Sequence, residues 1–422
     1  MSVRSLADWL FYQERLHPSQ IELGLERVQK VFQKLIDQPF NSPVIIIGGT
    51  NGKGSTIACL ESIYRSAGYT TGSYTSPHIL RYNERIRING QSVDDETLVR
   101  AFEHIENCRE DISLTYFEFG TLAALLIFYE AMPDILLLEV GLGGRLDAVN
   151  IMDPDVSIIS SIALDHTDWL GTSIEQIALE KAGIARGGKP LIYGAMYPPE
   201  SLMKQAGKIG ADFYRINDEF GYNQHGKNTW MWWGNHQSLP DLPLPTLIGE
   251  HQLANCSAAI QAVMLLDQRL PVPVFAIKQG LSTIQLAGRF EIVQTKPMVI
   301  HDVAHNAAAG EVLASMLNDQ HITGKTHAIV GMQSSRQPDD FIRSIAGQVN
   351  YWYACTLSGN AVHSSCDLSD SISKISPVSV VTAYKSVAEG LQSAMANVRP
   401  EDRIIVTGSF LTVAQAKATE HV

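Results

Sequence analysis

VIIIGGTNGKGSTIACLESIYRSAGY, residues 44–69, is the stretch of the sequence that decides the fold. An apolar, β-branched run leads into a Gly-rich turn with one lysine, and the turn leads into a helical pattern. Glycines let backbone N–H groups face an anion, and the N-terminus of the following helix favours negative charge. Lys53 would add a point charge for the β and γ phosphates of a nucleotide, and Ser55 or Thr56 would offer a hydroxyl to Mg²⁺. The stretch therefore predicts a phosphate-binding strand, turn and helix.

The turn departs from the usual phosphate-loop pattern GxxxxGK[ST] at two positions. Ile47 stands where the first glycine belongs, and Gly54 directly follows the lysine. The prediction therefore depends on the strand, turn and helix together. The alternative is a tight turn in a purely structural unit, but such turns rarely need three glycines and a lysine.

Apolar runs that alternate with amphipathic stretches predict an α/β protein with parallel sheets. One series of strands is expected at 44–49, 135–141, 156–164 and 189–194. A second is expected at 298–306, 327–332, 351–357, 378–384 and 403–410. Because single cores stop growing at roughly 250 to 300 residues, a chain of 422 residues is expected to form two domains. We place a P-loop-type ATPase domain at 1–287 and a smaller Rossmann-like domain at 288–422, with a hinge at Gly288–Arg289.

Between the two series, the Trp-rich segment 218–245 has Asn, Gly and Pro punctuation that predicts hairpins, with its aromatic rings used for packing. A helix is expected at 255–269 and another that ends near Gln285.

Composition excludes several classes of protein. Lys plus Arg number 32 against 44 Asp plus Glu, so the net charge is −12 and a large basic face for nucleic acid is not expected. The N-terminal sequence lacks the pattern of a signal peptide, and no apolar run reaches the length of a membrane span. We expect a cytoplasmic monomer that binds neither nucleic acid nor membrane. The five cysteines have no CxxC spacing, and they are expected to be packing residues without disulfides or zinc.

Polar side chains at strand ends predict a metal site beside the phosphate loop. Glu139 ends one apolar run, and Asp165 with His166 ends the next. In open α/β sheets ligands gather at the carboxyl ends of strands, and a carboxylate and an imidazole suit Mg²⁺ or Mn²⁺. By itself His166 is more often a capping or core histidine. Lys181, on a helical stretch, is a surface lysine by its periodicity alone.

A set of motifs in fixed order resembles the dihydrofolate synthase/folylpolyglutamate synthase family, within the Mur ligase group. The motifs are GGTNGKGST, TSPHILRYNERIRING, LTYFEFGT, EVGLGGRLDAVN, SIALDHTDWLG, EKAGI, GEHQLAN, AGRFEI, HDVAHN and VTGSF. They run over nearly the whole chain, and IELGLERV with LTYFEFGT resembles the bifunctional bacterial enzymes.

The resemblance implies ATP and two Mg²⁺ sites, with Mn²⁺ as an alternative metal. The implied ATP-binding residues are Gly49, Thr50, Asn51, Gly52, Lys53, Gly54, Ser55, Thr56, Asn255, Arg289 and Asp302. The implied metal ligands are Ser55, Ser76, Glu139, His166 and Lys181, the last as a carboxylated lysine. Lys53, His166 and Lys181 are the expected catalytic residues, His166 as a metal ligand and not a general base. On this basis Lys181 is expected to be a site residue, against the periodicity.

The implied reaction joins L-glutamate to dihydropteroate and to reduced folates, through an acyl phosphate formed with ATP. The implied pterin-binding residues are Glu22, Leu23, Gly24, Leu25, Thr115, Tyr116, Phe117, Glu118, Arg145, Leu146 and Asp147. Asp147 is expected to pair with the amino and imino groups of the pterin ring. His305 and Ser409 match positions associated with glutamate.

The sequence departs from the family in the smaller domain. Ala307 stands in place of the usual proline, QSSRQPDDF replaces an acidic-Lys-acidic run, and a Pro-Arg pair is missing from LSGNAVHSSCDL. These changes concern the expected glutamate pocket. Alternatives are a Mur-type ligase for peptidoglycan precursors, a non-catalytic nucleotide-binding protein and a simple P-loop kinase. Only the substrate segments separate the first of these from a folate ligase.

Overall fold

The computed structural model describes residues 4–19, 21–226, 228–234, 236–359 and 361–420. The chain divides into two compact units. The first comprises Met1–His78, Tyr82–Thr246 and Gln252–Gln285, and the second comprises Ile79–Arg81, Leu247–His251 and Leu286–Val422. Both are α/β units built on largely parallel sheets, which confirms the predicted fold class. The predicted domain bounds, 1–287 and 288–422, stay a prediction, as does the hinge.

An eight-stranded sheet organises the described part of the first unit, in the order β4-β3-β2-β5-β1-β6-β7-β8. The β2–β3 and β3–β4 pairs are antiparallel, and the other pairs are parallel. Four of these strands were predicted, although β6 ends several residues earlier than expected; β2, with the sequence TGSY, is too short and polar to be recognised. The bounds are β1 Val44–Gly48, β2 Thr71–Tyr74, β3 Ile86–Ile88, β4 Gln91–Ser92, β5 Ile135–Glu139, β6 Val156–Ile159, β7 Pro190–Tyr193 and β8 Asp212–Arg215.

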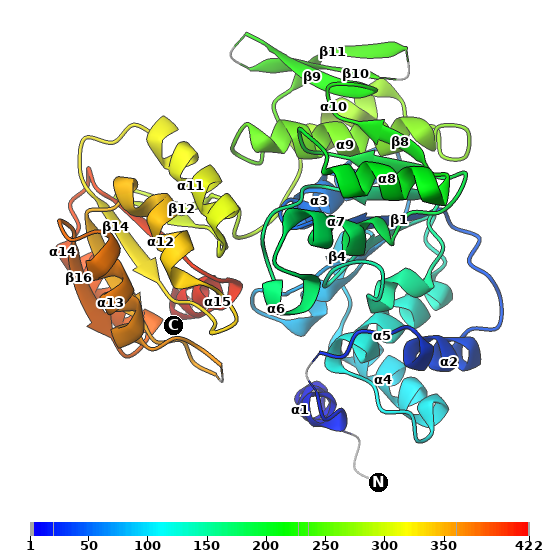
Figure 1. Ribbon diagram of the computed structural model, residues 1–422, viewed down its shortest axis with the longest axis horizontal. Helices are drawn as coiled ribbons and strands as arrows, with labels where there is room; N and C mark the ends of the chain where they lie inside the picture. The colour runs from blue at the N-terminus through cyan, green and yellow to red at the C-terminus, as the bar shows by residue number, and fades with distance from the viewer. Residues whose placement is uncertain (1–3, 20, 227, 235, 360, 421–422) are drawn as a thin grey trace. The chain divides into compact units, whose positions relative to one another are not determined.

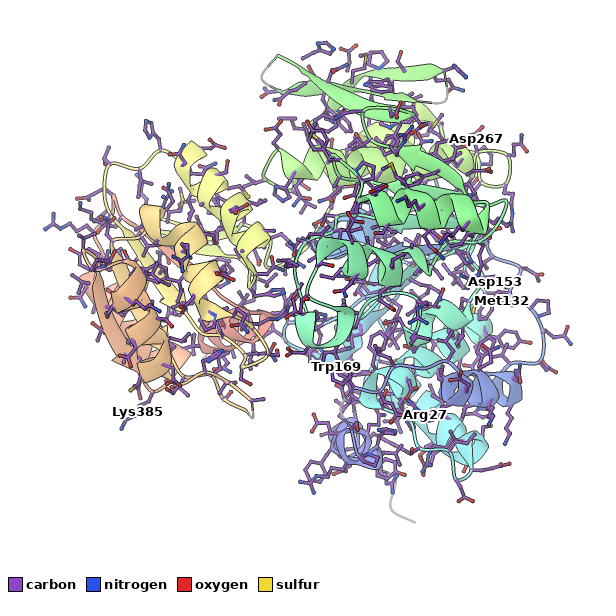
Figure 2. The ribbon with its side chains drawn as sticks, in the orientation of Figure 1. Arg27, Met132, Asp153, Trp169, Asp267 and Lys385 are labelled. Atoms are coloured by element: carbon purple, nitrogen blue, oxygen red, sulfur yellow. The ribbon has the colours of Figure 1, made fainter. Side chains whose placement is uncertain are left out.

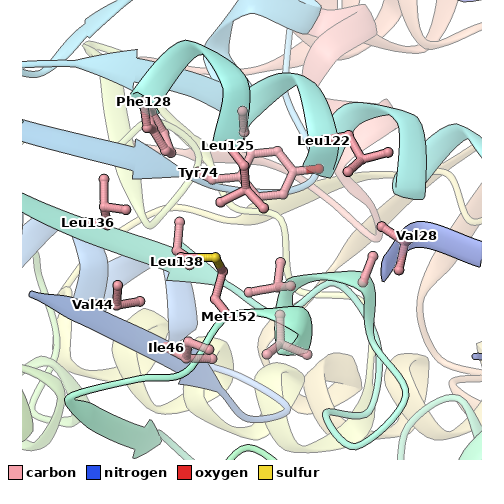
Figure 3. Close-up of a cluster of buried hydrophobic side chains, with 14 of the residues drawn as sticks. Val28, Val44, Ile46, Tyr74, Leu122, Leu125, Phe128, Leu136, Leu138 and Met152 are labelled. Atoms are coloured by element: carbon pink, nitrogen blue, oxygen red, sulfur yellow. The ribbon is translucent and has the colours of Figure 1, made fainter. Parts of the chain in front are cut away.

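Helices complete the first unit and bury the faces of its sheet. The helix α5 is apolar nearly all round, and its Leu122, Leu125 and Phe128 share one buried cluster with side chains of β2 and β5 (Figure 3). Such a helix must be buried on most sides, because exposing its apolar area to water is costly. The bounds are α1 Leu6–Leu16, α2 Glu26–Leu35, α3 Lys53–Ser66, η1 Tyr82–Arg85, α4 Asp95–Arg109, α5 Tyr116–Ala131, η2 Ala148–Ile151, α6 Thr167–Leu170, α7 Ile174–Ala182, α8 Glu200–Ile209, α9 His251–Leu265 and α10 Val274–Ser282.

The Trp-rich segment forms a small antiparallel sheet of β9 (Phe220–His225), β10 (Thr229–Gly234) and β11 (Gln237–Pro243), next to α10 (Figure 1). Trp230 and Trp232 are fully buried, and their indole N–H groups donate to backbone carbonyls of Pro243 and Ser257. Hairpins and packing tryptophans were both predicted. Residues 227 and 235 of the predicted segment lie outside the described residues.

The second unit contains a six-stranded sheet in the order β12-β13-β17-β14-β15-β16, parallel apart from β12. All five strands predicted for this region are present; β12 was missed. The bounds are β12 Glu291–Thr295, β13 Met298–His301, β14 Thr326–Val330, β15 Tyr351–Cys355, β16 Val380–Tyr384, β17 Arg403–Thr407, α11 Ala307–Asp319, α12 Pro338–Ile345, η3 Ala346–Gln348, α13 Ser365–Ile375, α14 Val387–Asn397 and α15 Phe410–Glu420.

The cysteines are free thiols, and Cys59, Cys256 and Cys355 are buried as predicted. Cys366 is exposed, so the prediction that it is a packing residue is wrong; it lies in the first turn of α13, on a side that the unit does not cover. None of the described helices has the length and apolar character that crossing a bilayer requires.

Candidate active site

The predicted phosphate loop lies between β1 and α3 and needs its glycines for steric reasons. Gly49 and Gly52 have φ angles of +137° and +91°, which L residues with a side chain rarely adopt. A Cβ atom on Gly49 would lie 2.1 Å from Oγ of Ser160, and one on Gly52 would lie 2.5 Å from Oδ1 of Asn255. The loop is therefore a closely packed turn at a helix N-terminus, a geometry that fits the phosphates of a nucleotide.

Two serines after β6 hold this loop. Ser160 Oγ donates to the carbonyl of Asn51 at 2.7 Å, and Ser161 Oγ donates to the same carbonyl at 2.9 Å. The backbone N–H of Thr50 donates to the carbonyl of Ser161 at 2.8 Å. Neither serine was predicted as a site residue, although both stand in the run 156–164, which was expected to be a strand.

Two lysines meet at one backbone carbonyl of the loop. Lys53 Nζ donates to the carbonyl oxygens of Gly49, at 3.1 Å, and Thr50, at 3.2 Å. Lys181 Nζ, from α7, donates to the carbonyl of Gly49 at 2.9 Å. Lys181 is buried, so its reading as a surface lysine is wrong. The tertiary fold turns this face of α7 toward the loop, which the periodicity of a nine-residue helix could not show.

Burial changes the protonation of Lys181. Desolvation, with the positive charge of Lys53 as a second cause, lowers the pKa of Lys181 to about 7, while the carboxylate of Asp165 opposes the shift. A large fraction of Lys181 is therefore a neutral amine near neutral pH. A neutral amine is the form that can react with CO₂ to give a carbamate.

The predicted metal ligands come from separate strand ends. The backbone N–H of Ser76, after β2, donates to Oε2 of Glu139, at the end of β5, at 3.0 Å. Because β2 and β5 are parallel neighbours, their carboxyl ends meet at one edge of the sheet. Ser55 is buried in the first turn of α3, the helix that follows the neighbouring strand β1.

His166 stands apart from the strand end where it was predicted. Since β6 ends at Ile159, His166 lies in the following loop, directly before α6, with φ of +50°. Its neighbour Asp165 acts on the charge of Lys181, which places this loop near α7. Trp169, on α6, is about half exposed (Figure 2).

Within the described residues, no three His, Cys, Asp or Glu side chains gather as a metal cluster. The predicted donor set has only Glu139 and His166 from these four types, with two serine hydroxyls and Lys181. A set with so few charges fits Mg²⁺, which usually keeps waters and takes ligands from substrate phosphates as well as from one or two carboxylates.

Three segments predicted to bind a pterin lie together in the first unit. Arg27, on α2, donates through Nη2 to Glu118 of α5 at 2.9 Å and also pairs with Glu22 (Figure 2 labels Arg27). Glu118 closes a capping box with Thr115, accepting from its N–H at 2.7 Å. The ring of Phe117 is so close to Gly141 that a Cβ there would lie 2.5 Å from it. Residues 22–25, 115–118 and the loop that leads to 145–147 are thus joined, and Arg27 was missed.

Asp147 was expected to pair with the pterin ring, and in the structure it organises its own loop. Its carboxylate is buried and accepts from the backbone N–H of Leu142, at 2.8 Å, and of Val149, at 3.0 Å. Burial raises the pKa of Asp147 to about 7, against these hydrogen bonds. Nearby, the N–H of Arg145 donates to the carbonyl of Glu180 at 2.8 Å, which fixes the loop to the helix of Lys181.

Replacement of Arg27 by methionine is expected to loosen the pterin segments. Glu118 would stay buried without its cation, at a cost of about 2 kcal/mol in unfolding free energy. Because the segments lose their common link, KM for the pterin substrate should rise about tenfold while kcat changes little. Thermal denaturation and initial rates measure the two effects. The double replacement with Glu118→Gln serves as the control: it should recover stability without recovering KM, and recovery of both would contradict the assigned role.

The second unit holds the other predicted residues at the ends of β13 and β17. The carboxylate of Asp302 accepts from the N–H groups of Phe290, at 2.8 Å, and Ala304, at 2.9 Å, which fixes the turn that carries Arg289. The ring of Phe410 lies 5.0 Å from the guanidinium carbon of Arg289 and 6.1 Å from the ring of His305.

Ser409 and Ala307 stand at the starts of helices in this unit. The buried hydroxyl of Ser409 accepts from the N–H of Thr412 at 3.0 Å, at the start of α15. Ala307, in place of the family's proline, is the first residue of α11, after the N-cap Asn306. Alanine suits this position as proline does, so the substitution leaves the helix start intact.

Family models match both units. The Mur ligase middle domain matches residues 47–263, and the Mur ligase glutamate ligase domain matches residues 288–410. A dihydrofolate synthase/folylpolyglutamate synthase from Escherichia coli (strain K12) is 42% identical over 412 residues, which cover 97% of this chain and 94% of that protein.

Solved structures agree over almost the full length. E. coli FolC in complex with DHPP and ADP has a TM-score of 0.92 and 41% identity, covering 99% of this chain and 98% of that one. A bifunctional folylpolyglutamate synthase/dihydrofolate synthase with Mn, AMPPNP and L-glutamate bound has a TM-score of 0.91 and 42% identity, with the same coverage. With this identity across both units, and with its phosphate loop and lysine pair in place, the chain belongs to the dihydrofolate synthase/folylpolyglutamate synthase family of the Mur ligases.

Proposed function

We propose that this enzyme joins L-glutamate to dihydropteroate, forming dihydrofolate, and to the γ-carboxylate of reduced folates, with ATP as the energy source. The observation that carries the proposal is the meeting of Lys53 and Lys181 at the carbonyl of Gly49, within a phosphate loop. A nucleotide loop alone needs one lysine. A second, buried lysine whose pKa is lowered to about 7 favours a site that binds metal through a carbamate.

For the nucleotide, we propose the residues of the loop together with Asn255. The side chain of Asn255 touches Gly52 and is fixed by Gln252, to whose Oε1 it donates at 3.0 Å. Lys53, which now lies across the loop carbonyls, would turn to the β and γ phosphates, since an ammonium on a flexible stem gains more from a phosphate than from a carbonyl. In the second unit, Arg289 and Asp302 are proposed to contact phosphate and ribose.

For the metals, we propose two Mg²⁺ or Mn²⁺ sites that share Ser55, Ser76, Glu139, His166 and Lys181 as ligands. Lys181 would serve as a carbamate, because an ammonium cannot bind a cation. Bound metal supplies charge neutralisation on the phosphoryl oxygens. Glu139 is held ready by the N–H of Ser76, which fixes the orientation of its carboxylate.

The first step forms the acyl phosphate. An oxygen of the substrate carboxylate attacks the γ phosphorus of ATP, the new P–O bond forms, and the bond between this phosphorus and the β–γ bridging oxygen breaks to release ADP. No proton is transferred in this step. The chain's task is positioning and electrostatics, with Lys53 near the transferring group.

The second step forms the amide. The nitrogen of the glutamate amine, in its neutral form, attacks the acyl carbon; the C–O bond to phosphate breaks, phosphate leaves, and the nitrogen loses a proton. His305 and Ser409 are proposed to bind the incoming glutamate. Cytoplasmic location and a monomeric state stay predictions from the sequence.

Phosphate release from ATP tests the function directly. Purified protein with Mg²⁺ and L-glutamate should release phosphate when dihydropteroate is added, and again when tetrahydrofolate is added. Background release in the absence of pterin or of glutamate is the control. Active, ATP-binding protein that responds to neither pterin would overturn the proposal, and a response to only one would restrict it to a single activity.

A further inference from the structure

A buried guanidinium lies among aromatic rings next to the proposed pterin segments. Arg85 ends the short helix η1 and is 9% exposed. Its Nε donates to Nδ1 of His78 at 2.9 Å. Within the described part of the chain, Arg85 forms no ion pair with a carboxylate. By contrast Arg87, two residues later, pairs with Glu61 at 3.2 Å.

Two tyrosine rings hold the guanidinium in place. Its central carbon lies 5.3 Å from the ring centre of Tyr82 and 5.5 Å from that of Tyr116. The two rings are nearly perpendicular, with centroids 5.6 Å apart. Cation–π contacts of this kind offset only part of the cost of burying a charge, roughly 0.5 to 2 kcal/mol each.

His78 fixes the direction in which the guanidinium faces. The guanidinium has no acceptor atom, so Nδ1 of His78 accepts the hydrogen bond from Nε of Arg85. The two terminal nitrogens of Arg85 are not among the fully buried atoms that lack a partner, so they retain access to solvent. They form a fork that is held in place and open to an anion.

A cation in this setting is costly unless a ligand completes it. Buried charges in proteins are normally paired, since the loss of hydration is only repaid by an opposite charge with good hydrogen bonds. The two terminal nitrogens of an arginine match the two oxygens of a carboxylate. The chain supplies no carboxylate to Arg85 among the described residues, which points to a carboxylate of the substrate.

The position of Arg85 between the proposed pterin and metal sites indicates which carboxylate of the substrate it would bind. Tyr116, which packs on Arg85, belongs to the proposed pterin segment. His78, which accepts from Arg85, is two residues after Ser76, whose N–H donates to the proposed metal ligand Glu139. The substrate has the same order: the pterin stands at one end and the reacting carboxylate at the other, beside phosphate and metal.

We propose that Arg85 binds the carboxylate of the pterin substrate that is activated by phosphorylation, with Tyr82 and Tyr116 as its walls. This inference rests on the function proposed above. In this role the guanidinium orients one oxygen toward the γ phosphorus and holds the other. It then faces the carbonyl oxygen of the acyl phosphate, where negative charge develops as the amine attacks.

A pair of ligands that differ only at this group tests the proposal. Binding of dihydropteroate and of its carboxamide analogue is measured by titration calorimetry on the full-length protein, for wild type, Arg85→Gln and Arg85→Lys. The matched control is Arg100→Gln, an exposed arginine on α4 outside the site. Wild type and Arg100→Gln should bind the carboxylate roughly 10- to 100-fold more tightly than the carboxamide.

In Arg85→Gln this preference should fall to near one, with affinity for the carboxamide within about threefold of wild type, and Arg85→Lys should lie between. Equal loss of affinity for both ligands in both variants would assign Arg85 to the pterin or to structure and overturn the proposal. An unchanged preference would overturn it too.

Failure of the proposed function gives a different result. If wild type binds neither ligand and releases no phosphate with dihydropteroate, the proposed function is wrong, and the role of Arg85 is wrong with it. Melting temperatures verify that the variants fold. If Arg85→Gln does not fold, the preference for carboxylate over carboxamide is measured in Arg85→Lys.

Discussion

Replacement of Lys181 by methionine is expected to lower kcat by about a thousandfold, with little change in the affinity for ATP. Methionine has a similar length and no charge, so packing in the buried site is retained. What is lost is the carbamate ligand of a metal, and charge stabilisation by a metal amounts to several kcal/mol, or about three powers of ten in rate. Initial rates and nucleotide titration measure the two quantities.

If Lys181 acts as a carbamate, activity should depend on CO₂. In the carbamate reaction the neutral nitrogen of Lys181 attacks the carbon of CO₂, the N–C bond forms and one proton leaves. Wild type depleted of CO₂ should therefore lose activity and recover it with bicarbonate, whereas Lys181→Met should respond to neither treatment. An exposed lysine, Lys189→Met, is the control and should behave as wild type. Full activity of CO₂-free wild type would contradict the carbamate.

The pH dependence of this recovery follows from the pKa of Lys181, which burial lowers from 10.5 to about 7. Below pH 7 the ammonium predominates and cannot attack CO₂; above it the amine predominates. At fixed CO₂ pressure, recovery should rise as pH increases through about 7. The same lowering means that the free energy of unfolding decreases as pH falls from 10.5 to 7, because in this range the unfolded chain binds a proton at Lys181 that the folded chain does not. Lys181→Met removes this effect, so the variant should not melt below wild type at pH 7.

Gly52→Ala is expected to remove nucleotide binding, with a loss of at least a hundredfold in affinity for ATP. Gly52 has φ of +91°, and a Cβ there would lie 2.5 Å from Oδ1 of Asn255, at the N-terminus that is proposed to receive the phosphates. The loop or Asn255 must shift, which turns N–H donors away from the anion; the loss of one such donor costs about a hundredfold or more.

Gly68→Ala is the matched control for backbone strain. Gly68 has nearly the same φ, +90°, but a Cβ there meets nothing within 4 Å. Gly68→Ala should cost roughly 1 to 2 kcal/mol of stability and leave the affinity for ATP unchanged. Nucleotide titration and thermal denaturation of both variants separate strain from contact. Equal losses of ATP affinity in the two variants would refute a special role of the loop.

Sequence alone identified the elements whose local signals are strong. The run 44–48 is apolar and β-branched, and the glycines and lysine that follow leave few alternatives to a phosphate loop. The second series of strands was found because each strand is a short apolar or β-branched run between helical patterns. Short polar strands such as β2 gave no such signal, because their side chains are not of the apolar types that indicate a buried strand. β2 is a strand because it pairs with β3 and β5.

Only the tertiary structure decided which residues meet. Arg27, Ser160 and Arg85 carry no local signal: each matters because a residue distant in sequence lies against it, namely Glu118, Asn51 and Tyr116. Lys181 has the periodicity of a surface residue, and packing of α7 against the loop makes it a buried amine. Composition and local pattern thus determined the fold class and the phosphate loop. Desolvation exists only in the folded chain, and it determined the charge state of Lys181. Long-range contacts determined that Arg27 pairs with Glu118 and that Arg85 packs against Tyr116.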